Sequence, residues 1–226
     1  MPSLIAFDLD DTLYKERTYV ASGYRTVAAA LAHNTGADPD LLFHIISKGR
    51  PFGFEAALKA VESLPGGKRL SVDDMIELYR AHCPDIALDP ADEEVLATLN
   101  RRGHTLLLIT DGSTRHQRAK IKALGLERFF APGNILISQE TGGDKFTPVP
   151  SGIADGIAAA KGLARRFYVG DNLAKDFLWP NRRGWTSVML RDPAGFNVFP
   201  QDIGTAPPEN RPHYIIDNLK TLLELT

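Results

Sequence analysis

Short apolar runs alternate with helical patterns through most of the chain beyond residue 100, and one such run also opens the sequence. The runs cover residues 4–7, 105–109, 166–169 and 186–190, with a weaker one at 135–137. Apolar runs of this length are typical of strands that are buried on both faces of a sheet. Apolar positions at helical spacing, each time followed by a glycine, mark residues 113–124, 150–161 and 173–183. The alternation predicts an α/β fold with a parallel sheet.

The segment between the first and second of these strands follows a different pattern. It carries four amphipathic helical patterns and no run typical of a buried strand; the patterns lie at residues 19–33, 40–48, 54–62 and 71–82. Turn residues separate them, in the groups Asn34-Thr35-Gly36, Gly49-Arg50-Pro51 and Pro65-Gly66-Gly67. We therefore expect a core made of residues 1–14 and 89–226, with a helical domain at 15–88 inserted into it. Within the core, residues 193–212 are typical of a loop and residues 218–225 of a closing helix.

Composition narrows the function classes. Of the 226 residues, 43% are hydrophobic and 24% are charged, which supports a sizeable folded core. The formal net charge of −2 gives no electrostatic basis for binding nucleic acid or an anionic membrane. No apolar stretch approaches the roughly 18 residues that span a bilayer, so we expect a cytoplasmic protein. The single cysteine, Cys83, excludes an internal disulfide, and we interpret it as a small apolar filler.

Two aspartates follow the first predicted strand directly. Asp8 and Asp10 are separated by one residue, and they lie where ligands bind in open α/β sheets, at the carboxyl end of a strand. Carboxylates this close repel one another unless a proton or a cation lies between them. A hard divalent cation such as Mg²⁺, which prefers oxygen ligands, would remove the repulsion. The same residues also fit a polar turn after a buried strand, and the pattern alone leaves both interpretations open.

The second long strand also ends in polar residues, Thr110, Asp111 and Gly112, and a helix follows. The Thr110 hydroxyl and the amides of the next two residues are suited to binding a phosphate group, since the N-terminus of a helix favours anions. An ordinary helix cap formed by Asp111 or Ser113 accounts for the same residues.

Two further groups supply charge. Lys145 lies in a loop before a predicted helix, where its ammonium is able to bind phosphate and offset a carboxylate; a solvated loop lysine is the simpler alternative. Asp171, Asn172 and Asp176 follow the strand at 166–169. Asp171 is placed as a metal ligand, and Asp176 is placed to orient a metal-bound water or to pair with Lys145. Helix capping by Asp171 or Asn172 is the alternative there.

In this order the polar clusters resemble the motifs of the haloacid dehalogenase-like hydrolases. Asp8-Leu9-Asp10-Asp11-Thr12 is similar to the D-x-D-x-T first motif, and Thr110 and Lys145 match the second and third. The stretch from Gly170 to Asp176 matches the fourth, GDxxxxD. One departure concerns the lysine, which is commonly followed at once by proline in this family, whereas Phe146 and Thr147 intervene here before Pro148. The resemblance covers residues 2–14 and about 89–226.

This resemblance implies a Rossmann-like core, an inserted α-helical cap and a phosphatase that uses Mg²⁺. Asp8 would attack phosphorus and form an aspartyl-phosphate, and Asp10 would act as acid and then as base. Asp8, the Asp10 backbone carbonyl and Asp171 would hold the metal. Thr110, Lys145 and the nearby amides of Asp111 and Gly112 would bind the phosphate. Thr12, Asn172 and Asp176 would support the residues that bind the metal and the phosphate, without binding either themselves.

The expected substrate is a small phosphorylated metabolite. Haloacid dehalogenases resemble the chain in fold but lack an aspartate at the position of Asp10, which favours phosphoryl chemistry. A phosphosugar mutase of the same superfamily and a phosphorylatable signalling module without turnover are the alternatives. Arg50, in the glycine-flanked loop at residues 49–54, is the candidate for substrate recognition from the cap. The sequence carries no signal for an oligomeric state.

Overall fold

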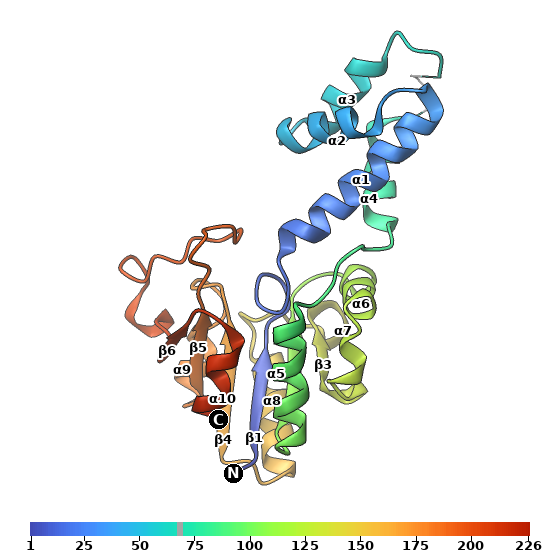
Figure 1. Cartoon of the computed structure of the whole chain (residues 1–226). Helices are drawn as coiled ribbons and strands as arrows, with labels where there is room; N and C mark the ends of the chain where they lie inside the picture. Colours follow the sequence, from blue (N-terminus) through green and yellow to red (C-terminus); the bar gives the residue numbers. More distant parts are fainter. Residues whose placement is uncertain (67–69) are drawn as a thin grey trace. The chain divides into compact units, whose positions relative to one another are not determined.

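Six parallel strands form one sheet in the order β3-β2-β1-β4-β5-β6 (Figure 1). They are β1 (Ser3–Phe7), β2 (Thr105–Thr110), β3 (Ile135–Ile137), β4 (Arg165–Gly170), β5 (Thr186–Leu190) and β6 (Tyr214–Ile216). The structure is a computed structural model, and it describes residues 1–66 and 70–226. The predicted α/β fold with a parallel sheet is confirmed, and the five apolar runs are its first five strands. The sequence did not predict β6, because two of its three residues are exposed.

The middle strand explains why the first apolar run has no polar position. β1 pairs with β2 on one side and with β4 on the other, and all five of its residues are buried. Leu4 and Ala6 pack on one face of the sheet in a cluster that includes Tyr168, Trp179 and Trp185. Burial on both faces favours apolar side chains, which occupy the strand from Leu4 to its end at Phe7. Ser3, the buried polar residue at its start, donates its hydroxyl to the Met1 carbonyl at 3.3 Å.

Helices cover both faces of this sheet. They are α5 (Pro90–Arg101), α6 (Thr114–Ala123), α7 (Ser138–Thr141), α8 (Pro148–Ala160), α9 (Leu178–Arg182) and α10 (Leu222–Leu225). In Figure 1, α5 and α10 lie on one face, and α8 and α9 on the other. Short 3₁₀ turns occur at Leu126–Arg128, Pro132–Asn134, Pro208–Asn210 and Leu219–Thr221. Helix α5 was not predicted from the sequence, although Asp89 caps it and Pro90 occupies its first turn, both of which are helix-start signals.

Two predicted helices are shorter than expected. The pattern at 173–183 forms a helix only from Leu178, because side chains bind the preceding backbone. Asp176 accepts hydrogen bonds from the amides of Asp171 and Asn172, and Asn172 Oδ1 accepts one from Ala174. Side-chain bonds of this kind compete with the helical ladder. The closing helix predicted at 218–225 begins as the 3₁₀ turn Leu219–Thr221, and only its last four residues are α-helical.

The chain separates into two compact units: Met1–Glu16 together with Ala87–Thr226, and Arg17–Ile86. We call them the core unit and the helical unit. The helices α1 (Glu16–Thr35), α2 (Pro39–Lys48), α3 (Gly53–Val61) and α4 (Val72–Ala81) account for the second, and its described residues contain no strand. Their apolar faces share a cluster that includes Leu31, Ile46 and Met75. Gly67, in the predicted turn at 65–67, lies outside the described residues.

The exposure of Cys83 and the character of the helices test two expectations drawn from composition: that the cysteine is an apolar filler and that the chain has no membrane-spanning stretch. Cys83 is exposed, so its interpretation as an apolar filler is wrong. It follows α4 in a segment where buried and exposed residues alternate, and Cys83 takes an outward position there. Among the described residues, no helix combines the length and the apolar character that crossing a membrane requires.

Candidate active site

Three strand ends bring polar residues to one edge of the sheet. Because β1 is parallel to both of its neighbours, β2 and β4, the carboxyl ends of the three strands lie side by side. A cavity of about 180 Å³ opens there within the core unit. It is lined by Asp8, Asp10, Asp11, Glu16, Thr110, Asp111, Lys145, Asp171, Asn172, Lys175, Asp176 and Phe199. Eight of the residues singled out from the sequence are among them.

Asp8 is a fixed and nearly buried carboxylate. Its side chain follows β1 directly, and its amide donates to the Val169 carbonyl at 2.9 Å, which extends the pairing with β4. One carboxylate oxygen pairs with Lys145 Nζ, and the other accepts a hydrogen bond from Thr12 Oγ1 at 3.3 Å. Burial raises the pKa of Asp8 well above its ordinary value, although Lys145 acts in the opposite direction.

Lys145 bridges two carboxylates. Its Nζ contacts Asp8 and lies 2.7 Å from Asp176 Oδ1, which also accepts a hydrogen bond from the Tyr168 hydroxyl at 3.1 Å. Burial disfavours the charged lysine, yet Asp176 and Asp8 together raise the pKa of Lys145 well above its ordinary value. The two residues inserted before Pro148 therefore do not keep this lysine from the site, and it carries a positive charge beside Asp8.

The fourth motif forms a tight turn around Asp176. Its Oδ2 accepts hydrogen bonds from the amides of Asp171 at 3.1 Å and Asn172 at 2.9 Å. A Cβ atom on Gly170 would lie only 2.5 Å from this oxygen, so the approach requires glycine. The turn fixes the backbone from which the Asp171 side chain enters the cavity.

Asp171 carries the least compensated charge of the site. It is 2% exposed, and burial, with Asp8 and Asp176 adding to it, raises the pKa of Asp171 to about 9. Its Oδ2 accepts a hydrogen bond from Asn197 Nδ2 at 3.0 Å, whereas in the described part of the chain Oδ1 accepts none. An ionised Asp171 therefore calls for a further positive partner.

The carboxylates are suited to a divalent cation. One oxygen from each of Asp8, Asp171 and Asp176 lies within 4.8 Å of the others. Asp176 already accepts hydrogen bonds from four donors, so the oxygens of Asp8 and Asp171 are the better ligands. All-oxygen, buried and under-neutralised donors fit a hard cation such as Mg²⁺.

The Asp10 carboxylate is not part of this acidic group. Its Oδ1 pairs with Lys120 Nζ at 2.7 Å and accepts a hydrogen bond from the Tyr14 hydroxyl. Its Oδ2 accepts one from Gln117 Nε2 at 3.2 Å. Of the predicted metal set, Asp8 and Asp171 bring carboxylates together, while the side chain of Asp10 is held by donors of its own.

The end of β2 is organised by Gln117. Its Nε2 lies 2.6 Å from Thr110 Oγ1 and 2.7 Å from the Asp111 carbonyl. Thr110 and Asp111 line the cavity, but Gly112 does not, and its amide donates to Ser138 Oγ at 2.9 Å. The backbone of Gly112 has a φ of 142°, and a Cβ there would lie 3.3 Å from the Gln117 side chain. Gly112 thus makes room for Gln117, and Ser113 caps α6, as the simpler alternative had it.

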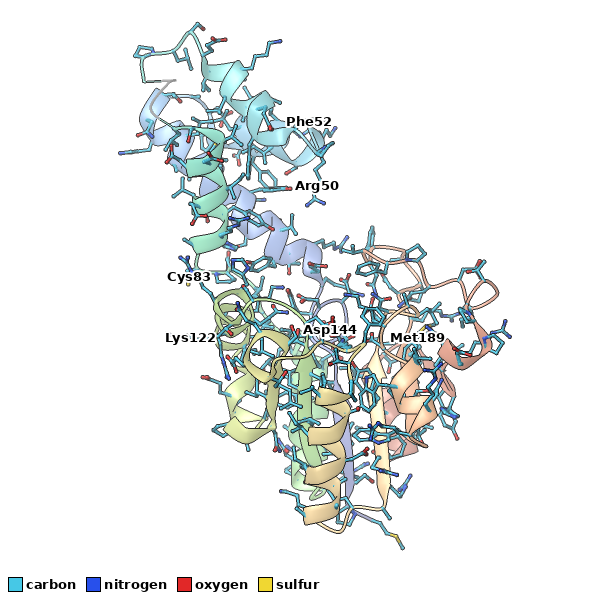
Figure 2. All side chains as sticks on the ribbon, turned by 180° about the vertical axis from the view of Figure 1, so that it is seen from behind. Arg50, Phe52, Cys83, Lys122, Asp144 and Met189 are labelled. Atoms are coloured by element: carbon cyan, nitrogen blue, oxygen red, sulfur yellow. The ribbon has the colours of Figure 1, made fainter. Side chains whose placement is uncertain are left out.

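Arg50 belongs to the helical unit and is described within it. Its Nε donates to the Tyr24 hydroxyl at 3.0 Å, and its guanidinium lies 5.2 Å from the centre of that ring. Phe52, in the same loop, is exposed, whereas Phe54 packs against the cluster of the unit. Figure 2 shows Arg50 and Phe52 together on the loop between α2 and α3.

Several residues of the site were not predicted from the sequence to have a role there. Gln117 and Lys120 lie on α6, where helical spacing puts them on one face, and their burial of 94% or more marks them as unusual polar residues. Lys175 lines the cavity from within the fourth motif. Asn197 and Phe199 come from the loop after β5, for which the sequence carries no local signal.

Comparison with known proteins gives one family match. A model of the haloacid dehalogenase-like hydrolases matches residues 2–178. This span contains Asp8, Thr110, Lys145, Asp171 and Asp176, and it ends before the loop that carries Asn197.

Relatives with assigned names cover the whole chain. Glyceraldehyde 3-phosphate phosphatase of Methanopyrus kandleri is 26% identical over 245 residues, covering 100% of this chain and 97% of that protein. Ribulose-1,5-bisphosphate 5-phosphatase of Halopiger xanaduensis is 27% identical over 249 residues, covering 100% and 99%. Among solved structures, the 2-haloacid dehalogenase of Pseudomonas syringae superposes with a TM-score of 0.60 at 22% identity, covering 100% and 98%. The last similarity concerns the fold alone, which therefore does not choose between phosphatase and dehalogenase chemistry.

Proposed function

This chain belongs to the haloacid dehalogenase-like hydrolase family, and we propose that it is a Mg²⁺-dependent phosphatase that hydrolyses a small phosphomonoester through an aspartyl-phosphate on Asp8. The observation that carries the proposal is the position of the Asp8 carboxylate. It lines a cavity at the strand ends, with Lys145 against it and the under-neutralised Asp171 nearby. The two named relatives, both phosphatases, support the reaction class.

Asp8 would act as the nucleophile in the first step. A carboxylate oxygen attacks phosphorus, the bond from phosphorus to the leaving oxygen breaks, and Asp8 becomes an aspartyl-phosphate. Lys145 reduces the repulsion between this carboxylate and the incoming phosphate, because its ammonium contacts Asp8. The Thr110 hydroxyl and the Asp111 amide would bind the phosphate oxygens, a role supported by the place of both residues in the lining of the same cavity. Gly112 is absent from this role, since its amide is engaged by Ser138.

Asp8 and Asp171 would hold the metal, together with the Asp10 backbone carbonyl that the family resemblance adds. When bound there, Mg²⁺ supplies positive charge that offsets the carboxylates and the phosphate. Lys145 and Asp176 keep the surrounding charges in place, because each is bonded on several sides.

Asp10 would transfer the protons. It gives one to the leaving oxygen in the first step, and it removes one from the water that attacks the aspartyl-phosphate in the second, which releases phosphate and restores Asp8. Tyr14, Gln117 and Lys120 hold its carboxylate apart from the Asp8 group, which suits a carboxylate that exchanges protons while only the backbone carbonyl of the residue binds metal. The presence of Asp10 favours phosphoryl transfer over dehalogenation, which needs no acid to release halide.

The substrate we propose is a small phosphorylated metabolite, and the helical unit is proposed to be its cap domain. The named relatives act on a triose phosphate and on a pentulose bisphosphate according to their names, so compounds of these classes belong at the head of a screen. Arg50 is the proposed contact from the helical unit with the part of the substrate that is not transferred.

The two aspartates have separable duties, and nitrophenyl phosphate separates them. Its leaving group needs no acid, so Asp10→Asn should still form the aspartyl-phosphate. Hydrolysis of that intermediate should slow by about 10²–10⁴-fold without its base. Rapid mixing should then show a burst of nitrophenolate close to one per protein, and mass spectrometry after an acid quench should show the added phosphoryl group. Asp8→Ala should show neither.

A matched control is Glu127→Gln, which neutralises an exposed acid of the core unit. It should keep wild-type kinetics. Wild-type protein should release one inorganic phosphate per turnover, which separates hydrolysis from a mutase and steady turnover from a signalling module. Phosphorylation of Asp8→Ala, or wild-type turnover by Asp10→Asn, would show that the assignment of the two residues is wrong.

A further inference from the structure

The loop after β5 folds back onto the candidate active site. Asp192 closes it, because its Oδ2 accepts hydrogen bonds from the amides of Phe196 at 2.6 Å and Asn197 at 2.9 Å. Further along, Phe199 lines the cavity at the strand ends. The loop lies beyond residue 178, where the family match ends.

Asn197 makes the most direct contact with the proposed machinery. Its Nδ2 donates to Asp171 Oδ2 at 3.0 Å and lies 3.5 Å from the Asp11 carbonyl. Its Oδ1 accepts a hydrogen bond from Lys15 Nζ at 2.7 Å. The neutral amide therefore stands between an ammonium group and the Asp171 carboxylate.

Two further contacts anchor the loop. The Val198 amide donates to Asp11 Oδ2 at 2.9 Å, and Asp11 is a buried residue with a φ of 58°. Gln201 Nε2 donates to the Asp171 carbonyl at 3.0 Å and to the Leu190 carbonyl at 2.9 Å. Asn197 is thus held in place from both sides, and its side chain has a defined direction.

We propose that Asn197 is a positioning residue for the divalent cation: it binds Asp171 Oδ2 and thereby leaves Asp171 Oδ1 directed for metal binding. The inference rests on the proposed function, because it assumes that Asp171 is a metal ligand. Partners behind a ligand fix its orientation, and their loss typically weakens metal binding by about 10–100-fold.

The chemistry of the amide supports this role. A lysine bound directly to Asp171 would neutralise the carboxylate and compete with the cation. The Asn197 amide donates a single hydrogen bond to the carboxylate and leaves its negative charge in place. By accepting from Lys15 while donating to Asp171, Asn197 also separates those two charges.

The test is the affinity of the metal-free, full-length protein for Mg²⁺, measured by isothermal titration calorimetry. Asn197→Ala should weaken binding about tenfold or more, while kcat recovers at saturating Mg²⁺. Gln201→Ala loosens the same loop without touching the carboxylate of Asp171, so it should lose less affinity. Asn100→Ala, which removes an exposed hydrogen bond to the Phe129 carbonyl, is the matched control and should bind as wild type.

The possible outcomes distinguish a failure of the role proposed for Asn197 from a failure of the proposed function on which it rests. If wild-type protein binds no Mg²⁺, the metal assignment and the inference both fall. If wild type binds and Asn197→Ala binds within about twofold of it, or if Gln201→Ala loses as much, the positioning role alone is overturned. Should the alanine variant melt below the assay temperature, Asn197→Leu, which keeps the branching of the side chain and the backbone bonds, carries the same test.

Discussion

Asp10 shows how much a single carboxylate depends on residues far along the chain. Lys120 and Gln117 reach it from α6, and both side chains are buried. A charge-assisted hydrogen bond restricts the direction of a carboxylate more strongly than a neutral one. We therefore assign the orientation of Asp10 to Lys120 in particular.

Replacing Lys120 tests this orientation. Lys120→Met should lower kcat/KM for an alkyl phosphate by about tenfold or more, since that leaving group needs a well-placed acid. The same variant should change kcat/KM for nitrophenyl phosphate much less, because kcat/KM reports the steps up to release of a leaving group that needs no proton. The measurement is a comparison of initial rates on the two substrates.

Lys122→Met provides the control on the same helix, since Lys122 is exposed and lies on the outer side of α6 (Figure 2). It should leave both substrates unaffected. An equal loss on both substrates in Lys120→Met would point to a general folding defect and contradict the orienting role.

At the scale of elements, Asp176 constrains the turn after β4 in two ways that the helical pattern of the sequence does not indicate. Asp176 uses both carboxylate oxygens to hold the turn and Lys145, and this interrupts the helix predicted at 173–183. The same carboxylate packs against Gly170, where β4 ends. Strand, turn and lysine are therefore one structural unit.

Gly170→Ala should disturb that unit. The added Cβ would lie 2.5 Å from Asp176 Oδ2, and the overpacking should cost about 1–3 kcal/mol of unfolding free energy and most of the phosphatase activity. Denaturant unfolding and a phosphate-release assay measure the two effects. Wild-type activity in this variant would show that the turn adjusts freely.

Gly156→Ala, also in the core unit, should have the opposite effect on stability. Gly156 is an exposed position inside α8, and a Cβ there would meet no atom within 4 Å. Because glycine in a helix interior has excess freedom when unfolded, this change should stabilise the protein by about 0.5–1 kcal/mol without affecting activity.

For the whole molecule, the site concentrates negative charge that lowers the stability of the metal-free protein. Burial raises the pKa of Asp171 to about 9 in the folded protein, from an ordinary value of 3.8. The folded state therefore keeps a proton that the unfolded state loses above pH 4. Stability conferred by that proton is lost as the pH rises toward 9.

Binding of Mg²⁺ should offset this loss of stability at high pH. Metal-free protein should melt several degrees lower at pH 8.5 than at pH 6, and the rise in melting temperature on adding Mg²⁺ should be larger at pH 8.5, where fewer protons compete for Asp171. Thermal melts with chelator and with excess Mg²⁺ measure both. Asp171→Asn should reduce the pH dependence and leave the part that comes from Asp8, whose pKa burial raises to about 7. A Mg²⁺ effect that is the same at both pH values would contradict the assignment.

The helical unit offers a second test at this scale. Arg50→Ala removes a guanidinium held by Tyr24, and it should change the ranking of natural phosphorylated substrates while affecting nitrophenyl phosphate much less. A panel of phosphorylated metabolites measures the ranking. Arg80→Ala, an exposed arginine on α4 paired with Glu77, is the control. An equal loss on every substrate would indicate a defect in folding or closure.

Local patterns were sufficient for the first five strands of the sheet and for the sequence order of the polar residues at their ends. A strand buried on both faces requires an apolar run, so β1, β2, β4 and β5 could be predicted from the sequence. Parallel pairing then places their carboxyl ends at one edge, which is why Asp8, Thr110 and Asp171 were expected together. The motif order supplied Lys145 in spite of the residues inserted after it.

Contacts between segments that are distant in sequence could not be predicted from the hydrophobic pattern. Lys120 reaches Asp10 across 110 residues, and Asn197 reaches Asp171 from a loop without periodicity. The helix predicted at 173–183 forms only in its last part, because side-chain hydrogen bonds of Asn172 and Asp176 bind the backbone before it. The spacing of apolar residues does not reveal such bonds. Hydrophobic periodicity records which face of an element is buried, because burial acts on every residue of that element. The direction of a polar side chain depends on the few donors and acceptors that packing brings to it, and these are set by the folded chain as a whole.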